Sequence, residues 1–128
     1  MTAPVLIVDD NAVNLKLARV LLESEGYLVQ TAGDAEEALE LLRTFTPRLI
    51  LMDVQLPGMD GLQLTRQLKA DPATRDIIII ALTAYAMKGD DLKMFAAGCD
   101  AYVTKPLHLD HLLRLIASHL SARGLPHA

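Results

Sequence analysis

Five polar side chains in this 128-residue sequence share one position, because each ends or directly follows a short apolar run. They are Asp9, Asp10, Asp53, Thr83 and Lys105. Short apolar runs bounded by turn residues predict strands that are buried on both faces of a sheet. In an open parallel sheet, ligands bind at the carboxyl ends of the strands. We therefore expect these five side chains to meet at one edge of a sheet.

Three carboxylates in one place repel each other and lose hydration unless a cation joins them. Lys105 supplies one positive charge, and a set of oxygen ligands without Cys or His indicates Mg²⁺ for the remainder. A carboxylate beside Mg²⁺ suits phosphoryl transfer, in which Asp53 attacks phosphorus and becomes an aspartyl phosphate. The metal, the Lys105 ammonium and the Thr83 hydroxyl with a loop amide would neutralise the phosphoryl oxygens.

Single members of this set also have structural explanations. Asp10 can act as the N-cap of a helix that begins at Ala12, and Thr83 can simply complete a strand. Five such residues at strand ends, without other evident partners, favour a shared chemical site.

The elements that would position these residues alternate along the chain. The expected strands cover residues 5–8, 27–32, 49–52, 77–83 and 101–104. Helical patterns cover residues 12–25, 34–45, 62–70, 90–97 and 109–120. This alternation predicts an α/β domain, a (βα)5 doubly wound five-stranded parallel sheet with right-handed crossovers and helices on both faces. The first strand should lie next to the third, which brings Asp9, Asp10 and Asp53 to one rim.

Two helices allow a prediction of their buried face. In residues 12–25 the apolar side chains cover an arc of roughly 220°, which is wider than one buried face requires. We expect Leu17, Ala18 and Leu21 at its centre to be buried and its flanks to be partly exposed. In the helix that ends at Gly98, the expected inward residues are Leu92, Phe95 and Ala96.

Composition excludes several classes of protein. The net charge is −4 without a basic cluster, which argues against direct nucleic-acid binding. No apolar run approaches the roughly 20 residues that a bilayer requires, and the N-terminus lacks a signal-peptide pattern. We therefore expect a cytoplasmic protein in which residues 1–128 form one domain without an output domain.

The sulfur and imidazole groups give little sign of chemistry. Cys99 is the only cysteine, which excludes an internal disulfide and fits a reducing compartment. We expect it to be a small buried residue rather than a nucleophile. His108 and His111 are three residues apart but lack an evident third ligand, so we do not expect a metal site there.

Four sequence blocks surround the predicted site. They are VLIVDDN at residues 5–11, LMDVQLPGMDG at 51–61, ALTA at 81–84 and YVTKP at 102–106. In this order they closely resemble the receiver domain of two-component response regulators, over the whole chain. The resemblance implies a flavodoxin-like, CheY-like fold with strand order 2-1-3-4-5. Residues 10–14 and 83–91 further resemble single-domain cell-cycle regulators and the receivers of hybrid kinases.

The resemblance also implies roles for individual residues. Asp53 would be the phosphoacceptor and would bind Mg²⁺ through its side chain, as would Asp10. Asp9 would act mainly through water, and the Gln55 backbone carbonyl would be a further ligand. By the same resemblance, Thr83 and Tyr102 are the switch residues, Lys105 is the salt-bridging lysine, and the Lys105–Pro106 peptide bond is cis.

Partners follow from the resemblance too. The phosphoryl group would come from a histidine kinase or a histidine phosphotransfer protein. The docking residues for that donor would be Asn11, Val13, Asn14 and Leu107. The wide apolar arc of the first helix can alternatively be absorbed by the final helix. A downstream protein would bind the surface formed by the fourth helix, fifth strand and fifth helix, and the chain would be a monomer or a weak phosphorylation-dependent dimer.

Two positions bear on the outcome of phosphorylation. Gln55 and Tyr85 flank the route by which a water would attack the phosphoryl group. As a separate departure from the family pattern, His108 stands where an Asp or Ser more usually caps the last helix. A Mg²⁺-dependent phosphatase that works through the same aspartyl phosphate is the alternative function. It is disfavoured because Gln55 stands where a second acid would be expected, two residues after Asp53. A degenerate receiver that is not phosphorylated is disfavoured because all the expected site residues are present.

Overall fold

The computed structural model describes residues 3–84, 89–105 and 108–124. Its strands are β1 (Pro4–Val8), β2 (Leu28–Ala32), β3 (Leu49–Asp53), β4 (Ile78–Thr83) and β5 (Ala101–Thr104). Its helices are α1 (Ala12–Ser24), α2 (Ala35–Leu41), α3 (Gly61–Ala70), α4 (Asp90–Ala97) and α5 (Leu109–Gly124). Strands and helices alternate throughout, so the predicted (βα)5 arrangement is confirmed.

The five strands form one parallel sheet in the order β2-β1-β3-β4-β5, as predicted. All residues of β3 and β4 are buried, which explains their nearly continuous apolar sequences. Val8 pairs with Met52 and Asp53 pairs with Leu82 in the ladder. This register brings the ends of β1, β3 and β4 to the same edge of the sheet.

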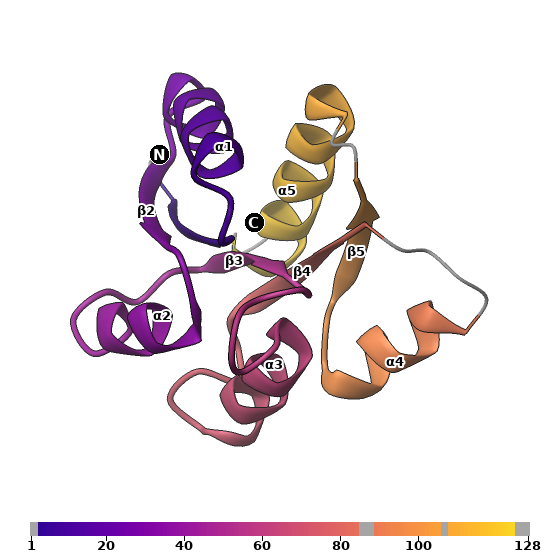
Figure 1. Ribbon diagram of the computed structural model, residues 1–128. Coiled ribbons are helices and arrows are strands. Elements are labelled where there is room, and N and C mark those ends of the chain that lie inside the picture. The colour runs from indigo at the N-terminus through magenta and orange to yellow at the C-terminus, as the bar shows by residue number, and fades with distance from the viewer. Residues whose placement is uncertain (1–2, 85–88, 106–107, 125–128) are drawn as a thin grey trace.

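Helices cover both faces of the sheet, with α1 and α5 on one face and α2, α3 and α4 on the other (Figure 1). Because successive side chains of a strand point to opposite faces, β3 contributes to two separate cores. Leu51 packs in the cluster that includes Leu22 of α1, whereas Met52 packs in the cluster that includes Leu64 of α3. The sheet is therefore rigidly supported from both sides.

The starts of α1 and α3 are defined by local side-chain caps. Asn11 is the N-cap of α1, where its side-chain oxygen accepts hydrogen bonds from the amides of Val13 and Asn14, both at 3.0 Å. The alternative that Asp10 caps this helix is therefore wrong. At the start of α3, Asp60 and Gln63 form a reciprocal capping box.

The buried face of α1 differs from the prediction. Ala18 and Leu22 are buried, whereas Leu17 is 53% exposed. Leu21 is half-buried. The apolar arc of this helix is wide enough to fit several orientations. In the observed orientation the buried face includes Ala18, as predicted, but has Leu22 in place of Leu21. The prediction of exposed flanks is confirmed by Val13, whose side chain is 74% exposed.

The prediction for α4 is also wrong. Met94 and Ala97 are buried against the sheet, while Leu92 and Phe95 are 70% and 49% exposed, respectively, and Ala96 is exposed. This helix has only eight residues, with apolar side chains on both of its faces, so periodicity alone does not identify the inward face.

Three further expectations can be compared with the structure. The Cys99 side chain is buried, and burial raises the pKa of its thiol, which disfavours the nucleophilic thiolate. None of the helices within the described ranges is long and apolar enough to cross a membrane. Helix α2 ends at Leu41, short of the expected end near residue 45.

Candidate functional site

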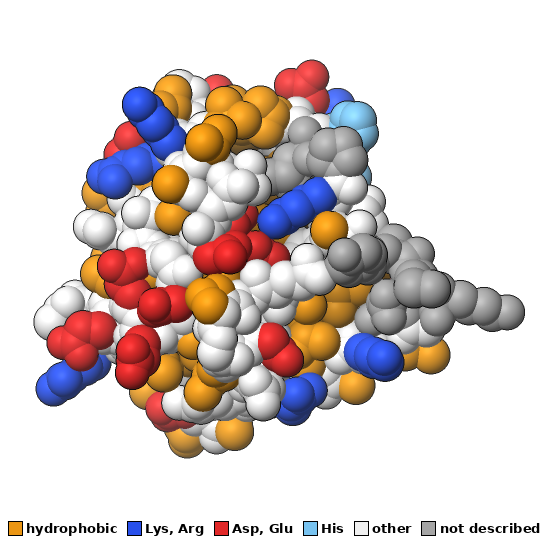
Figure 2. All heavy atoms as spheres, in the orientation of Figure 1, with side chains coloured by type: hydrophobic (Ala, Val, Ile, Leu, Met, Phe, Trp, Pro, Cys, Tyr) orange, Lys and Arg blue, Asp and Glu red, His pale blue; other side chains and the backbone are white. Residues whose placement is uncertain are grey.

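The three predicted carboxylates do meet at the carboxyl edge of the sheet. Asp9, Asp10 and Asp53 each place one carboxylate oxygen within 4.8 Å of the others. Asp9 and Asp53 are only 1% and 3% exposed, whereas Asp10 is exposed at the rim. Figure 2 shows acidic side chains gathered in the middle of this face, with a basic side chain beside them.

Each buried acid is oriented by a backbone amide two residues further along the chain. The Asn11 amide donates to Asp9 Oδ1 at 2.9 Å, and the Gln55 amide donates to Asp53 Oδ1 at 3.0 Å. Such local Asx hydrogen bonds are favoured where a strand leads into a loop. These hydrogen bonds fix both carboxylates. The Oδ2 atom of each carboxylate faces Lys105, which directly follows β5.

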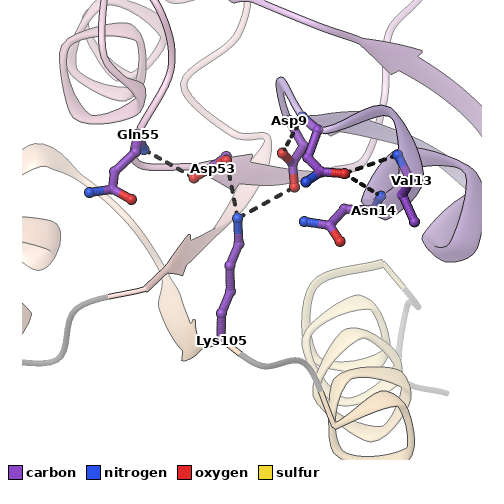
Figure 3. A network of polar contacts seen from close by, with 7 residues as sticks. Asp9, Val13, Asn14, Asp53, Gln55 and Lys105 are labelled. Atoms are coloured by element: carbon purple, nitrogen blue, oxygen red, sulfur yellow. Dashed lines mark hydrogen bonds and ion pairs between the residues drawn. The ribbon is translucent and has the colours of Figure 1, made fainter.

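Lys105 lies between these two oxygens, as Figure 3 shows. Its Nζ atom is 3.2 Å from Asp53 Oδ2 and 3.6 Å from Asp9 Oδ2. The Lys105 amide also donates to the Thr83 carbonyl at 2.7 Å, which continues the pairing of β4 with β5 past Thr104. The ladder therefore sets the position of both Lys105 and Thr83, whose side chain is buried.

The site carries more negative than positive charge. Among its described side chains, three carboxylates share the one ammonium of Lys105. Burial raises the pKa of Asp53, and the neighbouring Asp9 raises it further, against the opposing effects of the Gln55 amide and Lys105. A buried carboxylate with a raised pKa is stabilised by an additional cation. Donors that are all oxygen fit Mg²⁺, for which Asp9, Asp10 and Asp53 are the available carboxylates.

A glycine that the sequence analysis did not single out supports this geometry. Gly61 donates its amide to the Val54 carbonyl at 2.9 Å, which folds the loop back onto the end of β3. A Cβ atom on Gly61 would overlap the Asp53 carbonyl oxygen and lie 2.9 Å from Val54 Cα. The Asp60–Gly61 dipeptide at a helix start was the available sequence signal.

The structure also places the predicted switch residues. Tyr102 pairs with Ala81 in the ladder, so it shares a face of the sheet with Ala81 and Thr83. Its ring packs edge-on against Phe95 of α4, with ring centroids 5.9 Å apart and an angle of 72° between the planes. Phe95 was expected to be buried, and this contact was not predicted.

The predicted docking residues lie near the site, at the start of α1. Asn11 and Val13 are exposed, and Asn14 is half-buried. The remaining predictions, for Leu107, Tyr85 and the Lys105–Pro106 bond, lie outside the described residues. For Gln55, the structure shows the amide bond to Asp53, while the role of its carbonyl remains a prediction.

Comparison with known proteins identifies the family of this chain. A family model described as the response regulator receiver domain matches residues 5–117. The chain belongs to the response regulator receiver family. It is 46% identical to the polar-differentiation response regulator DivK of Brucella ovis over 120 residues, which cover 94% of this chain and 98% of that protein.

Solved receiver structures share its architecture. The receiver domain of a signal transduction histidine kinase from Syntrophus aciditrophicus has a TM-score of 0.90 and 31% identity, covering 99% of this chain and 96% of that one. The receiver domain of a sensor histidine kinase from Pseudomonas aeruginosa has a TM-score of 0.85 and 34% identity, covering 94% and 99%. In the latter structure a magnesium ion is coordinated in the active-site cleft.

Proposed function

We propose that this receiver domain is a phosphorylation-driven switch of a two-component or phosphorelay system. It accepts a phosphoryl group on Asp53 from a histidine kinase or a histidine phosphotransfer protein. The observation that carries the proposal is the buried Asp53 carboxylate, fixed by the Gln55 amide and facing the Lys105 ammonium at 3.2 Å. This arrangement combines an oriented nucleophile with a cation for the developing phosphoryl charge.

Asp53 supplies the attacking oxygen in the proposed reaction. A new oxygen–phosphorus bond forms as the nitrogen–phosphorus bond of the donor breaks, and the imidazole leaves with the electron pair of that bond. Lys105 faces both Asp9 and Asp53 and would accompany one phosphoryl oxygen. Asp10 and Asp53, with Asp9 through water and the Gln55 carbonyl, would hold Mg²⁺, which when bound neutralises phosphoryl charge.

Phosphorylation of Asp53 would change the protein surface near α4 and β5 through Thr83 and Tyr102. The Thr83 hydroxyl would bind a phosphoryl oxygen, and Tyr102 on the neighbouring strand would turn inward behind it. A downstream protein would then read the surface made by α4, β5 and α5. The phosphodonor would dock on Asn11, Val13, Asn14 and Leu107, two of which the structure shows to be exposed.

Phosphorylation with a small donor tests the proposal directly. The protein is incubated with acetyl phosphate and Mg²⁺, and aspartyl phosphate is measured by intact mass. We expect incorporation by the native protein, loss of it in Asp53→Asn, and loss of it with excess EDTA. Asp76→Asn is a suitable control, because Asp76 is an exposed acid outside the site.

Two results would contradict this function. Undiminished incorporation in Asp53→Asn would place the phosphoryl group elsewhere, and incorporation without a divalent metal would remove the proposed role of the acidic cluster. Continuous release of phosphate from many small phosphate esters would instead support a phosphatase. That outcome is disfavoured because Gln55, an amide rather than an acid, follows Asp53 by two residues.

A further inference from the structure

The outer face of α4 carries an aromatic contact to β5 that joins a helix to a predicted switch residue. Phe95 is 49% exposed and Tyr102 is 36% exposed, yet their rings pack edge to face at 5.9 Å. Leu92, one helical turn before Phe95, is 70% exposed. Aromatic pairs prefer this T-shaped geometry over a face-to-face sandwich. Phe95 is therefore positioned as a specific partner for the Tyr102 ring.

The end of α4 that carries Phe95 is firmly held. Its neighbours Met94 and Ala97 are buried, and the amides of Gly98 and Cys99 donate to the last carbonyls of the helix at 3.0 and 3.1 Å. The methylene stem of Lys69 lies over Gly98, where a Cβ atom would be 2.7 Å from Lys69 Cγ. The Phe95 ring consequently stands on a fixed part of α4, within the last turn of the helix.

Tyr102 lies on the same face of the sheet as Thr83. It faces the α4 side of the sheet, opposite to the buried Val103, and is paired in the ladder with Ala81. The small side chain of Ala81 places little bulk between Tyr102 and Thr83, which is two residues further along the same face of β4. A turn of the ring from Phe95 toward Thr83 thus requires loss of the aromatic contact.

We propose that Phe95 is a positioning residue that holds the Tyr102 ring in its half-exposed place and so opposes its turn toward Thr83. The inference rests on the proposed function, because that turn is the step expected to follow phosphorylation of Asp53. An aromatic pair of this geometry corresponds to about a 2- to 12-fold change in an equilibrium. Removing the Phe95 ring should shift the position of Tyr102 by a factor in that range before any phosphoryl group is bound.

The experiment compares Phe95→Ala with Leu92→Ala. Both positions lie on the exposed face of α4. Of these two side chains, only Phe95 packs against an aromatic ring among the described contacts. Fluorotyrosine is incorporated in a background with Tyr27→Phe and Tyr85→Phe, so that the fluorine resonance reports on Tyr102 only. Circular dichroism checks folding, and Phe95→Tyr, used without the fluorine label, retains a ring at the same place for the binding measurement.

The first readout uses the protein without ligand. We expect Phe95→Ala to move the Tyr102 resonance, with Leu92→Ala close to the native position. The second readout is titration with beryllofluoride and Mg²⁺, a phosphoryl mimic. Because the contact favours the outward ring, Phe95→Ala should bind the mimic about 2- to 10-fold more tightly than native protein, and Leu92→Ala should bind it equally well.

The outcomes separate this inference from the proposed function. If native protein binds beryllofluoride but Phe95→Ala neither moves the resonance nor tightens binding, the role of Phe95 is overturned while the switch function stands. Weaker binding by Phe95→Ala also overturns it, since the ring would then favour the activated state. If native protein fails to bind the mimic at all, the proposed function is rejected together with the inference.

Discussion

Two lysine–carboxylate contacts lie at opposite edges of the sheet and differ in their balance of charge. At the carboxyl edge, Lys105 faces the buried Asp9 and Asp53. At the amino end of β4, Lys69 Nζ contacts Asp100 Oδ2 at 3.1 Å. Both lysine side chains are partly buried, with 22% and 18% of their surface exposed.

The Lys69 contact is matched charge for charge. Its ammonium also donates to the carbonyls of Arg75 and Ile77, at 3.2 and 2.7 Å, and Asp100 accepts a further hydrogen bond from the Ile79 amide at 2.8 Å. The ion pair therefore joins α3, the start of β4 and the approach to β5. Such a satisfied network stabilises a fold without a need for any ligand.

The Lys105 contact is unbalanced by comparison. One ammonium is shared by two buried carboxylates, with the third acid of the cluster close by, and the pKa of Asp53 is raised. The same two residue types thus serve as scaffold at one edge and as a site at the other. Among the residues that the structure describes, the site is distinguished by unmatched negative charge, which is costly in the free protein and available to bind a cation.

The largest expected effect concerns the glycine beneath the unbalanced site. Gly61→Ala should lower the free energy of unfolding by about 3 kcal/mol, because its Cβ atom would overlap backbone atoms of β3 that cannot move aside. Urea unfolding of purified protein measures this loss. Gly33→Ala is the control, since a Cβ atom there would lie 3.7 Å from a Glu37 side-chain oxygen, an ordinary contact.

The comparison predicts a different outcome for the glycine at the balanced edge. At Gly98 a Cβ atom would lie 2.7 Å from Lys69 Cγ, a side-chain atom rather than backbone, and the positive φ of 108° adds strain. Gly98→Ala should therefore cost less than Gly61→Ala. A smaller loss for Gly61→Ala would show that the loop after Asp53 is not as tightly fixed as its contacts indicate.

Removing each lysine tests the contrast in charge. Lys69→Met should cost about 2 kcal/mol, because it removes three hydrogen-bonding contacts, including the ion pair of the Lys69 ammonium with Asp100. Lys105→Met leaves an acidic cluster that a divalent cation can still neutralise. Thermal unfolding is measured for each variant with EDTA and with Mg²⁺. We expect Mg²⁺ to raise the unfolding temperature of Lys105→Met by more than it raises that of native protein, and that of Lys69→Met by no more than that of native protein. Equal metal responses would remove the distinction between the two edges.

Much of this architecture was predictable from sequence. Apolar runs that end in Asp9, Asp53 and Thr83 predicted both the parallel sheet and the meeting of these residues at its edge. Such runs allow few alternatives, because a strand buried on both faces needs apolar side chains throughout. The four sequence blocks added the family, which the comparisons confirm.

Helix orientation was much less predictable. Leu17 and Phe95 were expected to be buried and are about half exposed. A short helix with apolar side chains on two faces has no unique inward side until its neighbours and the sheet are in place. The balanced Lys69–Asp100 pair was likewise missed, because 31 residues separate its partners and no local pattern connects them.

The smallest expected effect is the most direct test of the comparison. In EDTA at neutral pH, Asp53→Asn should raise the free energy of unfolding by about 1 kcal/mol, since it removes an ionised side chain that the folded state disfavours. Asp100→Asn should lower it, because Lys69 then loses its countercharge. Destabilisation by both variants would mean that the charge at Asp53 is already balanced.

The pH dependence gives the sign of this effect independently. The pKa of Asp53 is raised in the folded protein, so the folded state binds the proton more tightly than the unfolded chain does. Native stability attributable to Asp53 should therefore be greatest at acidic pH and should fall as pH rises through the folded pKa. The advantage of Asp53→Asn over native protein, measured by urea unfolding in EDTA, should shrink on acidification. An advantage that grows toward acidic pH would instead mean that the site stabilises the Asp53 carboxylate, as a completed ion pair does.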